Sequence, residues 1–70
     1  MNVEVFRTNV HEVAHASQMK GVLLQQFPGT KINFDLYDCD KILRMEGAGL
    51  CTEKVMNILS DHGFFCDLLD

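Results

Sequence analysis

Apolar residues recur along the chain with two different periods, and each change of period predicts a boundary between elements. The β-branched and aromatic run from Val3 to Phe6 predicts a short strand that ends near Thr8. Residues 10–27 are instead apolar at steps of three and four, which predicts a helix with one buried stripe, and Pro28-Gly29 ends that helix. The stripe consists of Val10, Ala14, Ala16, Met19, Val22, Leu23 and Phe27.

The start of this first helix is predicted at Val10. Asn9 and Glu12 have the spacing of a capping box, in which the Asn side chain accepts from a helix amide and the carboxylate reaches back to the cap. The pair therefore predicts Asn9 as the N-cap residue.

After this helix the period changes to two. Residues 30–36 alternate apolar and polar side chains, which predicts a strand with one face in water. The Asp-Cys-Asp sequence at residues 38–40 predicts a turn, and residues 42–46 predict the returning strand. Alternation places Leu43 and Met45 on the core face of that strand.

A second helix is predicted over residues 51–62, after the Gly-Ala-Gly sequence at residues 47–49 ends the strand. Gly63 stands where a helix commonly ends in a left-handed residue, and residues 64–69 predict the last strand. The face of this helix that is predicted to be buried consists of Val55, Ile58 and Leu59.

These elements have the order βαββαβ in one domain, residues 1–70. Rules on the handedness of connections favour an α+β fold, the ferredoxin-like sandwich, with a four-stranded antiparallel sheet and two helices on one face. In that topology the ends of the first strand, the second strand and the second helix lie at one pole. The residues predicted to meet there are His11, Glu12, His15, Asp38, Cys39 and His62.

Composition and charge narrow the classes of function. With 47% hydrophobic and 23% charged residues the chain is expected to fold around a core. The net charge is -4, whereas proteins that bind nucleic acids or anionic lipids usually present a basic surface. A nucleic-acid partner is therefore not expected. Neither a basic leader nor a run of 18 apolar residues occurs, so we expect no membrane insertion and a cytoplasmic location.

The cysteines do not predict a disulfide framework or a zinc knuckle. The chain has an odd number of cysteines, and no two of them have the Cys-x-x-Cys spacing. They are Cys39, Cys51 and Cys66. They are interpreted as reduced thiols. Cys39, at the predicted hairpin tip, is the one expected to be exposed, whereas Cys51 is expected at a helix N-cap and Cys66 inside a strand.

Residues 11–15 read His-Glu-x-x-His, the pattern with which zinc proteases place two imidazoles and a general base on one helix face. In a protease this pattern lies within a helix beneath a cleft, with a third ligand from elsewhere. Here it spans a predicted helix start, and a domain this small has little structure with which to wall a substrate groove. The chain is therefore not expected to be an enzyme.

The layout resembles the heavy-metal-associated domains, the copper-chaperone-like modules that carry Met-x-Cys-x-x-Cys between the first strand and the first helix. The chain can be aligned with the family through residues 6–10, which lead from the strand into the loop, and through Met19 and Leu23 as buried helix positions. In this alignment Val10 stands in place of the family's methionine. The likeness extends to residues 40–43 in the hairpin. It also includes Gly63-Phe64, where the family often has an aromatic residue beside its metal loop.

In this alignment the chain resembles a degenerate member of the family without Cys-x-x-Cys, because Glu12 replaces the first cysteine and His15 the second. Copper(I) prefers thiolates, whereas carboxylate and imidazole suit zinc, nickel or cobalt. The prediction is a site for a divalent transition metal ion, zinc first, used for metal carriage or sensing. Glu12 and His15 are its core ligands, with His11, His62 or Cys39 in support.

One alternative to the metal site remains open from the sequence. Glu12 in a first helical turn stabilises the helix by about 0.3–1 kcal/mol through its interaction with the helix dipole, without any metal ion. His15 and His62 can be ordinary surface residues. The domain would then be a metal-free module for protein interaction or self-association, a monomer or weak homodimer. The second and fourth strands would be open sheet edges. Apolar residues on the wet face of the sheet would add a contact surface, namely Tyr37, Ile42, Phe65 and Leu69.

The alignment of the loop leaves a second register to consider. A shift by one residue would place Val13 and Ala16 at the cysteine positions. The helical period disfavours that shift, because Lys20 would then fall on the core face.

Overall fold

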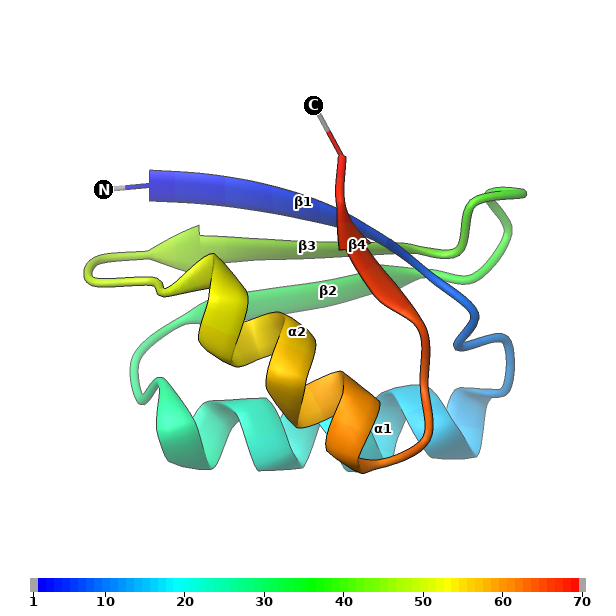
Figure 1. Ribbon diagram of the computed structural model, residues 1–70, viewed down its shortest axis with the longest axis horizontal. Helices are drawn as coiled ribbons and strands as arrows, with labels where there is room; N and C mark the ends of the chain where they lie inside the picture. Colours follow the sequence, from blue (N-terminus) through cyan, green and yellow to red (C-terminus); the bar gives the residue numbers. More distant parts are fainter. Residues whose placement is uncertain (1, 70) are drawn as a thin grey trace.

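The computed structural model describes residues 2–69 and has the predicted order of elements. These are β1 (Asn2–Thr8), α1 (Val13–Gln26), β2 (Lys31–Asp35), β3 (Ile42–Gly47), α2 (Thr52–Asp61) and β4 (Cys66–Leu68). The strands pair antiparallel in the order β2-β3-β1-β4, and both helices lie on one side of the sheet (Figure 1). The predicted ferredoxin-like α+β sandwich is confirmed.

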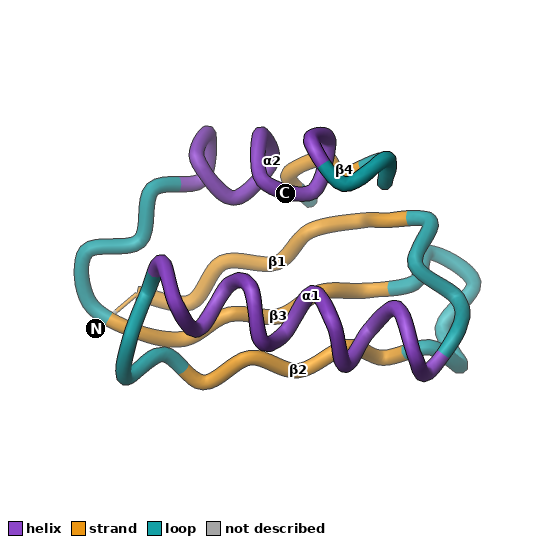
Figure 2. The backbone as a smooth tube through the Cα atoms, turned by 90° about the horizontal axis from the view of Figure 1, so that it is seen from below, coloured by secondary structure: helices purple, strands orange, loops and turns teal. Residues whose placement is uncertain are grey.

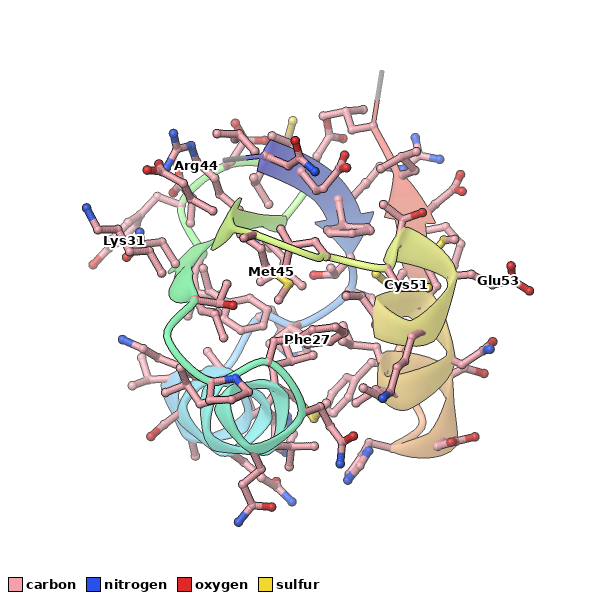
Figure 3. The ribbon with its side chains drawn as sticks, turned by 90° about the vertical axis from the view of Figure 1, so that its left-hand side faces the viewer. Phe27, Lys31, Arg44, Met45, Cys51 and Glu53 are labelled. Atoms are coloured by element: carbon pink, nitrogen blue, oxygen red, sulfur yellow. The ribbon has the colours of Figure 1, made fainter. Side chains whose placement is uncertain are left out.

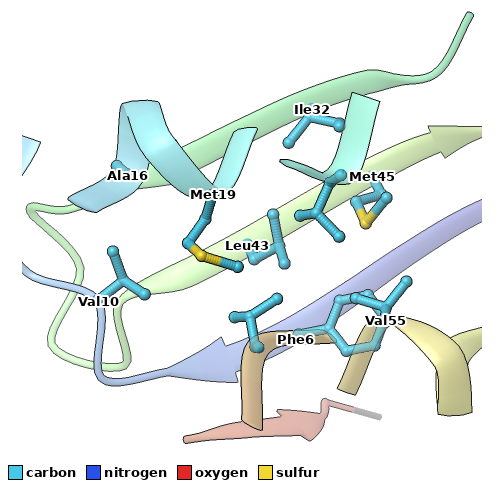
Figure 4. Close-up of a cluster of buried hydrophobic side chains, with 10 residues drawn as sticks. Phe6, Val10, Ala16, Met19, Ile32, Leu43, Met45 and Val55 are labelled. Atoms are coloured by element: carbon cyan, nitrogen blue, oxygen red, sulfur yellow. The ribbon is translucent and has the colours of Figure 1, made fainter. Parts of the chain in front are cut away.

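The core lies between the sheet and the two helices. Phe6 on β1 is paired with Leu43 on β3, which is paired in turn with Phe34 on β2. Met45 and Phe27 point into the space between the layers, whereas Arg44 points away from it (Figure 3). Figure 4 shows the centre of this cluster. The buried hydrophobic residues are Phe6, Val10, Ala16, Met19, Leu23, Ile32, Leu43, Met45, Val55 and Leu59.

The start of α1 differs from the prediction. The helix begins at Val13 rather than Val10, its N-cap residue is Glu12, and no side chain caps it. Asn9 does not cap the helix because its side chain accepts a hydrogen bond from the Phe65 amide, 2.8 Å away. The Val10 amide meanwhile donates to the Thr8 hydroxyl at 3.1 Å. One distant bond, to Phe65, and one local bond, to Thr8, therefore hold Asn9 and Val10 outside the helix.

The end of α2 explains why the last strand is shorter than predicted. Gly63 has φ +85°, as expected for a left-handed cap, and its amide donates to Ser60. The Phe64 amide donates to the Leu59 carbonyl, which completes a Schellman motif. Phe64 thus belongs to the end of the helix, and β4 begins only at Cys66.

The face of the sheet opposite the helices carries charged and apolar side chains. On this face, oppositely charged residues are register partners on neighbouring strands, as Lys31 is to Glu46 and Arg7 is to Asp67. Val3 and Leu69 are partly exposed. No helix within residues 2–69 is long and apolar enough to cross a membrane.

Candidate metal centre

The end of β1 is tied to the loop between β2 and β3 by the side chain of Thr8. Its hydroxyl donates to the Lys41 carbonyl at 2.6 Å and accepts the Val10 amide. The Thr8 amide also lies within hydrogen-bond distance of the Asp40 and Lys41 carbonyls. Because Thr8 is buried, these bonds set the direction in which the chain enters the loop of residues 9–12.

The turn after α2 meets the same loop from the other side. The Asn9 side chain binds the Phe65 amide, as described above, and the His15 ring lies 5.3 Å from the Phe64 ring between centroids. The predicted meeting of three segments at one pole is therefore confirmed. Phe64 thus lies beside the first turn of α1.

Near the start of α1, one carboxylate oxygen of Glu12 lies between the rings of His11 and His15. Glu12 Oε2 lies 3.8 Å from His11 Nε2 and 3.8 Å from His15 Nδ1. The Nδ1 atom of His11 lies 3.2 Å from the Asn9 carbonyl and can only donate to it. The His11 proton is thereby placed on Nδ1, and in the neutral ring Nε2 has a free lone pair close to Glu12.

His11 and Glu12 are exposed and His15 is half-buried, and the three side chains do not surround a common point. The relative exposures of their side chains are 66% for His11, 59% for Glu12 and 42% for His15. They do not form a group in which every ligand atom lies within 4.8 Å of the others. Adjacent ligand atoms around tetrahedral zinc lie roughly 3.3 Å apart, given bonds of about 2.0 Å. The histidines must therefore close on Glu12 to hold an ion.

The possible ligand atoms of His62 and Cys39 do not group with those of Glu12 and His15. His62 Nδ1 donates to the Ile58 carbonyl at 2.8 Å, in the last turn of α2. Cys39 forms a ligand group with Asp38 and Asp40, whose ligand atoms lie within 4.8 Å of one another. Among residues 2–69 no such group joins His62 or Cys39 to Glu12 and His15.

Burial along residues 10–20 follows the helical period. Val10 and Met19 are fully buried, whereas Lys20 is exposed. Val13 is also exposed, at 76%. Lys20 therefore lies outside the core, as the helical period predicted.

Two residues that organise the pole were not identified from the sequence. Thr8 continues the inward alternation of Phe6 and Val10, so a threonine at a buried position was the available signal. Asn9 was interpreted as a helix cap, and no local pattern distinguishes that role from its bond to Phe65, 56 residues away.

Cys66 is expected to be the least reactive thiol of the folded protein. Burial, with a smaller contribution from the Asp67 carboxylate, raises the pKa of the Cys66 thiol from 9.0 to about 12. At pH 8 such a thiol is roughly one ten-thousandth thiolate, so iodoacetamide should modify the exposed Cys39 and Cys51 and spare Cys66. Mass spectrometry after a timed reaction measures the three rates, and equal rates in the folded state would contradict this expectation.

The same shift has a consequence for stability. Because the pKa is higher in the folded state than in the unfolded chain, the contribution of Cys66 to stability is complete below pH 9.0. It is lost as the pH rises from there toward about 12. Urea unfolding at a series of alkaline pH values follows this loss. The variant Cys66→Ala should show a weaker dependence in that range.

Comparison of the chain with models of protein families, with curated proteins and with solved structures finds no match. A function must therefore be inferred from the residues and their geometry.

Proposed function

We propose that this domain binds a divalent transition metal ion through Glu12, His15 and His11, and that it carries or senses the ion. The observation that supports the proposal is the position of Glu12 Oε2, 3.8 Å from a ring nitrogen of each histidine. Carboxylate and imidazole are ligands for zinc, nickel and cobalt rather than for copper(I). Zinc is the first candidate because it accepts a small tetrahedral set of nitrogen and oxygen ligands.

The local structure allows the closure that binding requires. His11 lies in the loop and Glu12 at the helix N-cap, so both side chains can rotate without disturbing the buried residues of α1. The distances to Glu12 must shorten by roughly half an ångström, and the two imidazoles must approach each other. Water would complete the coordination.

The surroundings of the two histidines favour their use as ligands. The bond from His11 Nδ1 to the Asn9 carbonyl is of the kind that fixes the tautomer and ring orientation of metal-binding histidines. The Phe64 ring restricts His15 from one side. Because two of the three ligands are exposed and His15 is half-buried, the ion would exchange with solvent, which suits carriage or sensing better than a structural role.

The proposal is tested by titrating the metal-free protein with zinc at neutral pH under reducing conditions, followed by NMR shifts of backbone amides and imidazoles. We expect saturable shifts confined to His11, Glu12, His15 and their neighbours. Glu12→Ala combined with His15→Ala should weaken binding by at least about tenfold, since even loss of an outer-shell partner has an effect of that size. Acidification should weaken binding as well, because ligating histidines must be neutral.

The matched control is His62→Ala, which removes an exposed histidine from the end of α2. It should leave zinc affinity unchanged. Circular dichroism of each variant establishes that the fold is intact. If the double variant binds zinc as the parent protein does, or if no saturable shift occurs up to millimolar zinc, the proposed function is wrong.

A further inference from the structure

A groove runs along the open edge of the sheet between α1 and β2. It consists of three open depressions of about 360, 320 and 310 Å³, the first of which shares lining residues with each of the other two. Ile32 and Phe34 form its floor, and Val13 and Lys20 its helical wall. Figure 2 shows β2 at the border of the sheet with α1 alongside it.

The backbone of β2 is free to pair on its outer side. Among residues 2–69, β2 has β3 as its one partner strand, so alternate amide and carbonyl groups face away from the sheet. The charged residues at its two ends, Lys31 and Asp35, have no ionic partner within 4.0 Å among residues 2–69. Such an edge is a template for another extended strand.

We propose that β2 pairs antiparallel with β2 of a second copy of this chain, about a two-fold axis at Asn33. The strand reads Lys-Ile-Asn-Phe-Asp and is self-complementary in that arrangement. Lys31 of each copy lies opposite Asp35 of the other, and Ile32 lies opposite Phe34. The interface is isologous, as a two-fold dimer requires.

Charge selects this orientation and register over the alternatives. In parallel pairing Lys31 would face Lys31 and Asp35 would face Asp35, which is repulsive. An antiparallel shift by two residues separates both Lys–Asp pairs. A shift by one residue places Ile32 and Phe34 of one copy opposite polar residues of the other. The apolar and polar side chains of the second copy would then lie on the opposite faces of the sheet.

The helices are compatible with this dimer. Val13 lies near the Phe34 end of the groove and Leu24 near the Lys31 end, and both side chains are exposed. The two-fold axis brings Val13 of one copy beside Leu24 of the other. Lys20 lies near the axis on each copy, and its long side chain can keep both ammonium groups in solvent.

Sedimentation equilibrium with a chelator present, from micromolar to millimolar protein, tests the proposal independently of any metal. The parent protein should show a monomer–dimer equilibrium that weakens with added salt. Asp35→Lys alone and Lys31→Asp alone place like charges opposite each other at both ends. Each should raise the dimer dissociation constant by at least about tenfold. The double variant with both changes should dimerise again.

Mixing the two single variants provides a further check, because one then supplies two lysines and the other two aspartates. We expect a one-to-one heterodimer from components that are separately monomeric. Asp61→Lys makes the same change of charge at the exposed end of α2 and should leave dimerisation unchanged. A parent protein that stays monomeric at millimolar concentration overturns the proposal, as does a dimer that neither single variant weakens.

Discussion

The variant Phe6→Ala is expected to be largely unfolded at about 25 °C. Phe6 is fully buried in the middle of β1, between Leu43 on β3 and Leu68 on β4. Truncating a buried phenylalanine to alanine costs about 3–5 kcal/mol, because the apolar contact is lost and a cavity remains. A core in a domain of this size rarely supplies more than about 3–5 kcal/mol of net stability. The truncation therefore removes most or all of the free energy of folding.

Urea unfolding followed by circular dichroism measures this loss. The matched control is Val3→Ala on the same strand, whose side chain is 46% exposed on the opposite face of the sheet. It should change stability by less than about 1 kcal/mol. Equal losses in the two variants would mean that Phe6 is not at the centre of the core.

Thr8→Val is expected to lower the free energy of unfolding by about 1–3 kcal/mol, even though valine has nearly the same shape. The hydroxyl is the donor to the Lys41 carbonyl and the acceptor for the Val10 amide. Valine leaves the Val10 amide, which is buried, without that partner. Leaving a buried polar group unsatisfied costs about this much.

The effect should extend to the candidate metal site. Thr8 holds the entry to the loop that carries His11 and Glu12, so Thr8→Val should speed amide hydrogen exchange in residues 9–12 and weaken zinc binding. Thr8→Ser keeps the hydroxyl and loses a methyl group, so exchange in the loop and zinc affinity should stay near those of the parent. If Ser and Val variants behave alike in exchange and zinc binding, the hydroxyl does not hold the loop.

Much of the fold could be predicted because its causes are local. Residues 30–36 and 42–46 alternate with period two, and the buried side chains that the alternation predicts, Ile32, Leu43 and Met45, are buried in the structure. Gly63 adopts the left-handed conformation that its place after an apolar helix face predicts. Once the order of elements is known, the handedness of connections leaves few topologies.

The candidate site was predictable only in part. Glu12 and His15 are three residues apart at a helix start, so their proximity follows from helical geometry. The predicted support from His62 and Cys39 depended on side chains carried by different elements. Whether such side chains approach within ligand distance depends on packing and hydrogen bonds at the scale of an ångström, which a pattern of residues does not contain.

By itself the sequence determined the order of strands and helices, most of their inward-facing residues and the pole at which the candidate ligands lie, because hydrophobic burial acts on every turn and every alternate residue. Ala14, predicted on the buried stripe of α1, is exposed. Only the tertiary structure decided that α1 begins at Val13. The side chain of Asn9 can either cap a helix or accept a distant amide. It binds Phe65, 56 residues away, because the folded sheet brings that amide within 2.8 Å. Competition between local and distant hydrogen-bond partners is resolved only when the chain is packed.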